Sequence, residues 1–268
     1  MIHRTARATA LCLAAALLAS GCASTGGAAF DTAAGRPVSG QPASSAGEAR
    51  ARNNVELGTA YLEIGRYDVA LDEARSALGH YANYAPAFNL MGLVYMMLEN
   101  NAAADDNFRR ALSIAPNDPD FNNAYGWFQC VSGRASEGLE RLNAAAGNPY
   151  NRFPGRALTN AGLCNLRTND DAGASAYFSR ALMVEPNNAQ ANYHMAAIAY
   201  RMNDYPGARQ HLANLHRANE PTAASLWLAL RVERRLGNVT SESSYASQLR
   251  SRFVNSPEYQ QMLRGQYE

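Results

Sequence analysis

Catalysis or metal binding in this chain would have to start from its histidines and cysteines. The five histidines are scattered, and even the closest pair, His211 and His216, is five residues apart, which does not place both on one face of a helix. The sequence contains no HExxH, CxxC, GxSxG or Gly-rich phosphate-binding motif. All 24 basic residues are arginine, which excludes a Schiff-base or phosphate-binding lysine. We therefore expect no catalytic residue, no metal ligand, no cofactor and no small-molecule substrate, and hence no enzyme.

The N-terminus has the features of an export signal. Residues 10–19 form an unbroken run of Ala, Leu and Cys behind a basic start, too short to span a bilayer but suited to a signal peptide. Residues 18–22 read Leu-Ala-Ser-Gly-Cys, which resembles the lipobox where bacterial lipoproteins are acylated and cleaved. We expect residues 1–21 to be a lipoprotein-type signal peptide and Cys22 to carry acyl chains such as palmitate. Ala23 follows, as in lipoproteins of the outer membrane. An ordinary signal peptide with a coincidental cysteine is the alternative.

A flexible tether is predicted to follow the lipidated cysteine, over residues 22–50. This stretch consists mostly of Ala, Gly, Ser and Thr with two prolines, and only Phe30 and Val38 are large and apolar. Such a composition buries too little apolar surface to compensate the entropy lost on ordering. A packed loop is the alternative interpretation.

From residue 51 the sequence repeats with a period of 34. The copies at 85–118 and 155–188 both have Gly at position 8, Ala at 20 and 27, Phe at 24 and Pro at 32. This pattern resembles the tetratricopeptide repeat, in which small residues let two antiparallel helices approach, an aromatic ring fills the space between them and proline ends the second helix. The resemblance implies an all-α fold, an α-solenoid of about six repeats with a concave and a convex side. The predicted repeats are 51–84, 85–118, 119–154, 155–188, 189–222 and 223–256, with a C-terminal capping segment at 257–268.

Two of these copies fit the pattern less well. The copy at 119–154 is two residues too long, and the extra length falls in residues 148–154, which are rich in turn formers and aromatics. The copy at 223–256 has Leu230 at position 8 and Glu242 at position 20. We interpret it as an atypical terminal repeat.

In this repeat family, positions 2, 5, 9 and 12 of each first helix face the concave groove. In the first four copies these positions are largely apolar, which is typical of a surface that binds an apolar helix or an extended segment. The carboxylate clamp of chaperone-type repeats has Lys at position 5 and Asn at position 9. The pairs Val55/Thr59 and Asn89/Leu93 do not match it. The alternative is that the next repeat covers these residues. The predicted partner groove consists of Val55, Thr59, Leu62, Asn89, Leu93, Met96, Asn123 and Trp127.

The cysteines allow one internal pairing. Cys12 would leave with the signal peptide and Cys22 would be acylated, so Cys130 and Cys164 remain. Both lie on first helices of adjacent predicted repeats, and the periplasm is oxidising. We expect a Cys130–Cys164 disulfide, with two buried free thiols as the alternative.

Three further segments resemble the PilF/PilW family of type IV pilus pilotins. They are Asn-Asn-Ala-Tyr-Gly-Trp-Phe-Gln-Cys at 122–130, the insertion at 148–154 and Leu-Thr-Asn-Ala-Gly-Leu-Cys at 158–164. The segment 249–253 and the tail 259–267 are also similar. The resemblance implies an outer-membrane lipoprotein on the periplasmic face that binds the secretin of the type IV pilus and promotes its outer-membrane localisation and multimerisation.

A scaffold for peptidoglycan enzymes or for another secretion or pilus system is the alternative function. Nucleic acid is not an expected partner, because the formal net charge is only +1. The expected partners are therefore a secretin subunit and, through the lipid, the outer membrane.

Overall fold

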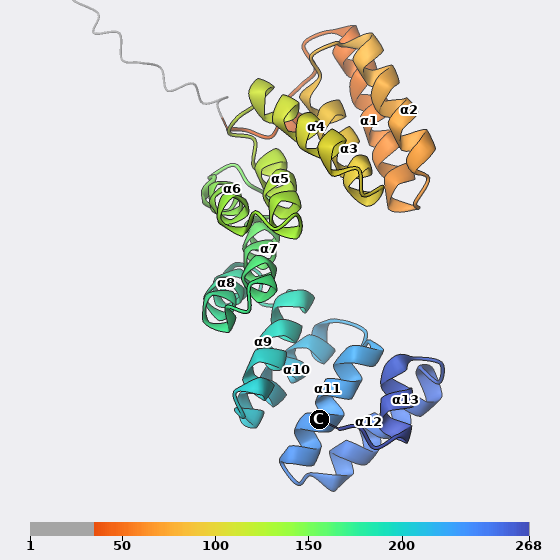
Figure 1. The fold of residues 1–268 in the computed structure, drawn as a ribbon, viewed down its shortest axis with the longest axis vertical. Helices are drawn as coiled ribbons and strands as arrows, with labels where there is room; N and C mark the ends of the chain where they lie inside the picture. Colours follow the sequence, from red (N-terminus) through yellow and green to blue (C-terminus); the bar gives the residue numbers. More distant parts are fainter. Residues whose placement is uncertain (1–34, 268) are drawn as a thin grey trace, which may run out of the picture. The chain divides into compact units, whose positions relative to one another are not determined.

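The computed structural model describes residues 35–267, which form one short 3-10 turn and thirteen α-helices in a continuous stack (Figure 1). The helices are connected by short turns, and each packs against the next. The bounds are η1 (Val38–Gly40), α1 (Ala46–Glu63), α2 (Tyr67–His80), α3 (Ala85–Met97), α4 (Asn101–Ile114), α5 (Pro119–Val131), α6 (Ala135–Gly147), α7 (Pro154–Arg167), α8 (Asp171–Val184), α9 (Ala189–Arg201), α10 (Tyr205–Ala218), α11 (Ala223–Arg235), α12 (Val239–Arg252) and α13 (Pro257–Leu263).

Helices α1 to α12 form six pairs, and the fold is an all-helical tetratricopeptide stack of about six repeats. The first helices α1, α3, α5, α7, α9 and α11 contact one another in series. Each second helix except α12 packs between the first helix of its own pair and that of the next pair, and α12 packs against α11 and α13. The first helices therefore form a common surface, called here the first-helix face, which consists of the side chains at positions 2, 5, 9 and 12 of each repeat.

Glycine and phenylalanine fit together inside the regular repeats. A Cβ at Gly92 would lie 2.7 Å from the ring of Phe108, and a Cβ at Gly162 would lie 2.5 Å from the ring of Phe178. Both rings are completely buried, as are the alanines at positions 20 and 27 of the same repeats. The small residues are therefore needed for the close approach of paired helices, as the repeat pattern predicts.

The two irregular copies also form helix pairs. In the third, a Cβ at Gly138 would lie 2.6 Å from the carbonyl oxygen of Gly126, so the backbones of α5 and α6 are close, and Leu142 replaces the aromatic ring in the core. In the sixth, Leu230 packs in one cluster with Leu249 of α12 and with residues of α13. The bulk at position 8 is thus covered by the last helix, which takes the place of a seventh repeat.

Each helix pair has its tight turn at position 15 of the repeat, where the backbone is left-handed. Glycine reaches such φ values without steric cost, and asparagine does so at a small cost. Glu99 is the exception, because it is neither. The six residues are Gly65 (φ 75°), Glu99 (φ 57°), Gly133 (φ 84°), Asn169 (φ 58°), Asn203 (φ 61°) and Gly237 (φ 71°).

The N-terminal segment, residues 35–45, corrects the predicted tether. The tether was expected to extend to residue 50, but α1 begins at Ala46 with Ser45 as its N-cap, and residues 38–40 already form η1. Val38 packs against two clusters of buried residues. The segment is ordered because its few apolar and backbone groups find partners on later repeats, which a count of its composition cannot reveal.

The signal peptide, Cys22 and the first part of the tether lie outside the described residues. Within residues 35–267, no helix has both the length and the apolar character that crossing a bilayer requires.

Candidate partner-binding site

The eight predicted groove residues all lie on first helices and all keep some exposure. Thr59 is exposed, and the other seven side chains are half-buried. The three helices that contribute them, α1, α3 and α5, are consecutive along the first-helix face (Figure 1). The groove residues therefore form a continuous surface that is accessible from one side.

The apolar members of this set also pack inward. Val55 and Leu62 contact the buried cluster around α2 and α3, and Leu93 and Met96 contact the cluster around α4 and α5. Trp127 packs against the cluster that contains the cysteines. Neighbouring helices therefore cover part of each of these side chains, as the alternative interpretation of the groove positions expects. The remaining exposed part is apolar and rests on a rigid base.

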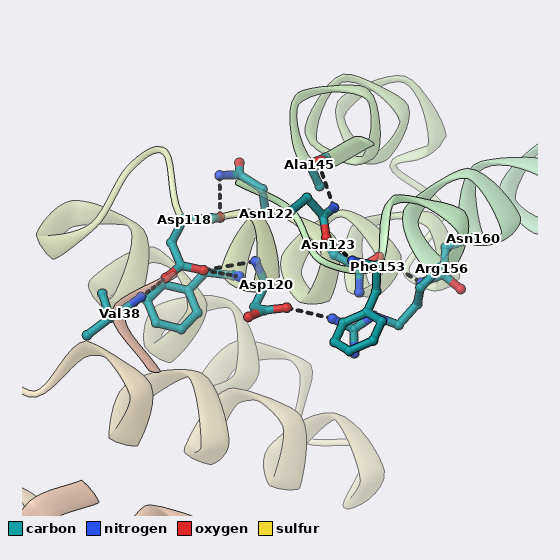
Figure 2. A network of polar contacts seen from close by, with 11 residues as sticks. Val38, Asp118, Asp120, Asn122, Asn123, Ala145, Phe153, Arg156 and Asn160 are labelled. Atoms are coloured by element: carbon teal, nitrogen blue, oxygen red, sulfur yellow. Dashed lines mark hydrogen bonds and ion pairs between the residues drawn. The ribbon is translucent and has the colours of Figure 1, made fainter. Parts of the chain in front are cut away.

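The polar members differ in what they offer. Asn123 accepts a hydrogen bond from Asn160 of α7 at 3.0 Å, so its oxygen already has a partner (Figure 2). Asp120 and Arg156 form an ion pair at 2.6 Å between the same two helices. These contacts connect α5 to α7 across the face. In contrast, Oδ1 of Asn89 is buried and has no hydrogen-bond partner among the described residues.

Cys130 of α5 and Cys164 of α7 are joined in a disulfide, as the sequence predicts. Both residues are almost fully buried, and the pair packs with Leu142 and Ala161. The closed loop spans 34 residues. In the chain-entropy model, a loop of this length stabilises the fold by about 3–4 kcal/mol. The third and fourth repeats are therefore joined by a covalent bond in addition to the polar contacts on their surface.

Asp118, the N-cap of α5, holds the N-terminal segment on the stack. Its Oδ2 accepts from the backbone N–H of Val38 at 2.7 Å, and its Oδ1 accepts from the N–H groups of Asp120 and Phe121 (Figure 2). The residue is 2% exposed. Burial raises its pKa from 3.8 to about 6, although the three N–H donors act in the opposite direction.

The insertion of the third repeat gives the N-terminal segment a second attachment. Nδ2 of Asn148 donates to the carbonyl oxygen of Gly35 at 2.8 Å. The guanidinium of Arg36 lies 5.0 Å from the centre of the Tyr150 ring, a cation–π contact. The described chain therefore begins at the third repeat and runs back to the first, where α1 starts. No local sequence pattern predicts this contact, because Val38 and Asp118 are 80 residues apart.

The first-helix face of the fifth and sixth repeats contains a pocket that was not predicted from the sequence. The predicted groove stays within the first four copies, yet the same positions in the next two copies line a cavity of about 480 Å³ together with residues of α13. Extending the four groove positions through all six copies would have found it. The six groove-position residues, called here the Arg231 pocket, are Tyr193, Ala197, Tyr200, Ala224, Trp227 and Arg231.

Three of the four histidines among the described residues are packing residues. Burial lowers the pKa of His194, His211 and His216, so their neutral forms are favoured. His194 stacks on Phe178, and Nε2 of His216 lies 2.9 Å from Oγ of Ser225. Over residues 35–267, no three His, Cys, Asp or Glu side chains are grouped as metal ligands would be.

Comparison with known proteins shows which proteins this chain is similar to. Residues 55–119 match the tetratricopeptide repeat family. The type IV pilus assembly protein PilF of Pseudomonas aeruginosa is 28% identical over 207 residues, which cover 77% of this chain and 82% of that protein.

Two solved structures agree with this match. The crystal structure of PilW, described as a widely conserved type IV pilus biogenesis factor, is 27% identical and covers 80% of this chain and 98% of its own, with a TM-score of 0.71. The structure of Pseudomonas aeruginosa PilF is 26% identical and covers 82% of this chain and all of its own, with a TM-score of 0.73. The chain is a tetratricopeptide repeat protein that is similar to the PilF and PilW type IV pilus assembly proteins over about four fifths of its length.

Proposed function

We propose that this protein is a pilotin: an outer-membrane lipoprotein that binds the secretin of the type IV pilus and promotes its localisation and multimerisation. The similarity to PilF over 77% of the chain carries the proposal, because it extends through the disulfide-linked repeats and the insertion. The described residues offer helix surfaces rather than a catalytic constellation, which suits a protein that acts by binding.

The mechanism requires a membrane anchor and a binding surface on the same chain. Acyl chains on Cys22 would supply the anchor, since each buried methylene contributes about 0.8 kcal/mol. Gly35, where the described chain begins, is 13 residues from Cys22 in sequence. A chain of that length spans at most about 45 Å. A secretin subunit bound to the repeats would thus stay close to the membrane, which raises its effective concentration for insertion and ring closure.

The first-helix face of repeats one to three is the proposed secretin-binding surface. Its half-buried apolar side chains rest on a rigid core and are accessible from one side. Thr59 is exposed in this surface, and its hydroxyl hydrogen-bonds only to the carbonyl oxygen of Val55 among the described residues. This surface requires no reaction chemistry, only complementarity to an apolar segment of the partner.

A strain that lacks the gene tests the proposal when it is complemented with variants. We expect loss of heat-resistant secretin multimers in the deletion strain and their return with the wild-type protein. Cys22→Ala should leave the protein without its lipid and the secretin mislocalised. Normal secretin rings in the deletion strain would contradict the pilotin role, and normal rings with Cys22→Ala would contradict the anchor mechanism.

A photoreactive residue at Thr59 connects this experiment to the proposed surface. We expect a crosslink to the secretin from this position. The matched control is Ser76, which is exposed on α2, the second helix of the same repeat. Equal crosslinking from both positions would argue against the first-helix face, and crosslinking to peptidoglycan enzymes instead would favour the scaffold function.

A further inference from the structure

The Arg231 pocket contains an arginine that is held in one orientation. The guanidinium of Arg231 lies 4.5 Å from the ring centre of Tyr200 and 6.0 Å from that of Trp227. Its Nε donates to the backbone carbonyl oxygen of Tyr267 at 3.1 Å. Stacking on aromatic rings leaves the edge of a guanidinium free to donate. The side chain is therefore ordered before any ligand arrives.

Arg231 has no carboxylate partner among residues 35–267. Arg201, which also lines the cavity, is paired with Asp171 in a bidentate contact, and Glu258 is the only carboxylate in the lining. An ordered arginine without a counter-ion favours a planar anion, which it can bind through two parallel hydrogen bonds.

The rest of the lining points to a peptide as the source of that anion. Tyr193, Tyr200 and Trp227 provide aromatic surface beside the guanidinium. The hydroxyl of Tyr200 is buried and has no hydrogen-bond partner among the described residues. The cavity, about 480 Å³ and open to solvent, has room for one or two side chains rather than a folded domain.

The chain's own tail shows how a peptide contacts these residues. Tyr267 places its ring 5.3 Å from that of Trp227 while its backbone carbonyl oxygen accepts from Arg231. Tyr267 does not line the cavity itself. An incoming segment can therefore use the same two residues from the other side without displacing the tail.

We propose that the Arg231 pocket binds an extended peptide segment of a partner protein through a carboxylate on Arg231, with an aromatic or apolar neighbour against Tyr193 and Trp227. This is a second docking site, separate from the groove of repeats one to three. It does not depend on which protein is the partner in the pilus, so it can hold or fail independently of the pilotin function.

Fluorescence anisotropy with defined peptides tests the proposal on the full chain in detergent. The probe is an end-blocked octapeptide of alternating Glu and Tyr, and the matched peptide has every Glu replaced by Gln. We expect the Glu peptide to bind at least tenfold more tightly than the Gln peptide, since each hydrogen-bonded charge pair is worth about tenfold or more in affinity. Arg231→Gln should remove this preference. Arg217→Gln is the control, because Arg217 is exposed on α10 and contacts only Asn214 among the described residues.

A second variant guards against a folding artefact, because Arg231→Gln also loses the contact to the tail. Ala197→Glu leaves Arg231 in place and adds a carboxylate to the same wall, so it should weaken the Glu peptide at least tenfold while the melting curve stays that of a folded protein. Equal affinity for the Glu and Gln peptides, or full binding by Arg231→Gln, would overturn the proposal. Binding that appears only after removal of residues 267 and 268 would also overturn it, because the occupant would then be the chain's own C-terminus.

Discussion

At the scale of single residues, Asp118 has the most informative environment. It caps α5 and holds Val38 with the same carboxylate, and burial raises its pKa to about 6. The raised pKa means that the folded protein keeps a proton that the unfolded chain releases at pH 4 to 6. The resulting stabilisation is full below pH 3.8 and is lost as the pH rises through 6. From the size of the shift it amounts to about 3 kcal/mol.

The Val38 amide reports this titration directly. We expect its proton chemical shift to titrate with a midpoint near pH 6, because the neutral acid accepts a weaker hydrogen bond than the carboxylate does. Asp118→Asn should abolish the titration, because an asparagine side chain has no titratable proton in this range. It should also speed hydrogen exchange at Val38, because the NH₂ group of asparagine would face a backbone N–H group where Asp118 now accepts a hydrogen bond. The measurement is two-dimensional NMR from pH 4.5 to 7.5.

A matched variant separates this effect from the loss of a helix cap. Asp170 caps α8 by accepting from Gly173 and has no contact with the N-terminal segment. Asp170→Asn should leave the Val38 titration unchanged. A midpoint near 4 in the wild-type protein would show that the buried environment does not govern Asp118.

At the scale of the helix pair, the left-handed turn at position 15 makes a specific prediction. Glu99 holds φ 57° where the other turns have glycine or asparagine. Glu99→Gly should raise the free energy of unfolding by about 1 kcal/mol, because glycine has no Cβ to clash in this conformation. Urea unfolding of the two proteins measures the difference.

The control for this substitution lies in a regular helix. Glu140 is exposed in the middle of α6, where glycine should lower stability by about 1 kcal/mol because it is a poor helix former. If both substitutions destabilise the protein to the same degree, the turn at residue 99 carries no strain.

The helix pairs themselves were largely predictable from the sequence. The period of 34 predicts five of the six first helices to within a residue, because the fit of Gly92 to Phe108 and of Gly162 to Phe178 imposes the pattern locally. The exception is α1, which begins at Ala46 rather than near 51. Its start depends on the Ser45 cap and the preceding segment, whose contacts are long-range.

The candidate site was predictable in part, for the same reason. Position within a repeat identifies which side chains face outward, and it would have identified Tyr200 and Arg231 as readily as Leu93. It does not show which polar atoms already have hydrogen-bond partners. The hydrogen bond from Asn160 to Asn123 is therefore visible only in the structure. Contacts between separate repeats are set by packing and have no local sequence pattern.

At the scale of the whole molecule, two regions of the stack should respond oppositely to acid. His194, His211 and His216 all lie in the fifth repeat, and their lowered pKa values mean that the unfolded chain binds protons that the folded chain does not. Their contribution to stability is thus lost as the pH falls below 6.5. The contribution of Asp118, the N-cap of α5, has the opposite sign in the same range.

Hydrogen exchange at pH 7 and pH 5 tests this difference. Stability in a repeat stack is a sum of repeat and interface terms, so its parts can open separately. After correction for intrinsic exchange rates, we expect the opening free energies of α9 and α10 to fall at pH 5 while those of α3 to α6 hold or rise. Replacing the three histidines by Gln should remove the loss in α9 and α10. A uniform change along the chain would contradict the prediction.

The route of the N-terminal segment determines how the protein bears a mechanical load. A pull on the chain ahead of Gly35 first meets the Arg36–Tyr150 stack, on the insertion of the third repeat, and the hydrogen bond to Asp118, the N-cap of α5. Helix α5 is joined to α7 of the fourth repeat by the Cys130–Cys164 bond. Traction is therefore transmitted to the covalently reinforced middle of the stack instead of peeling α1 from its end. The contacts on α5 and on the insertion must break before the load reaches α1, so the surface of the first repeat keeps its shape until then.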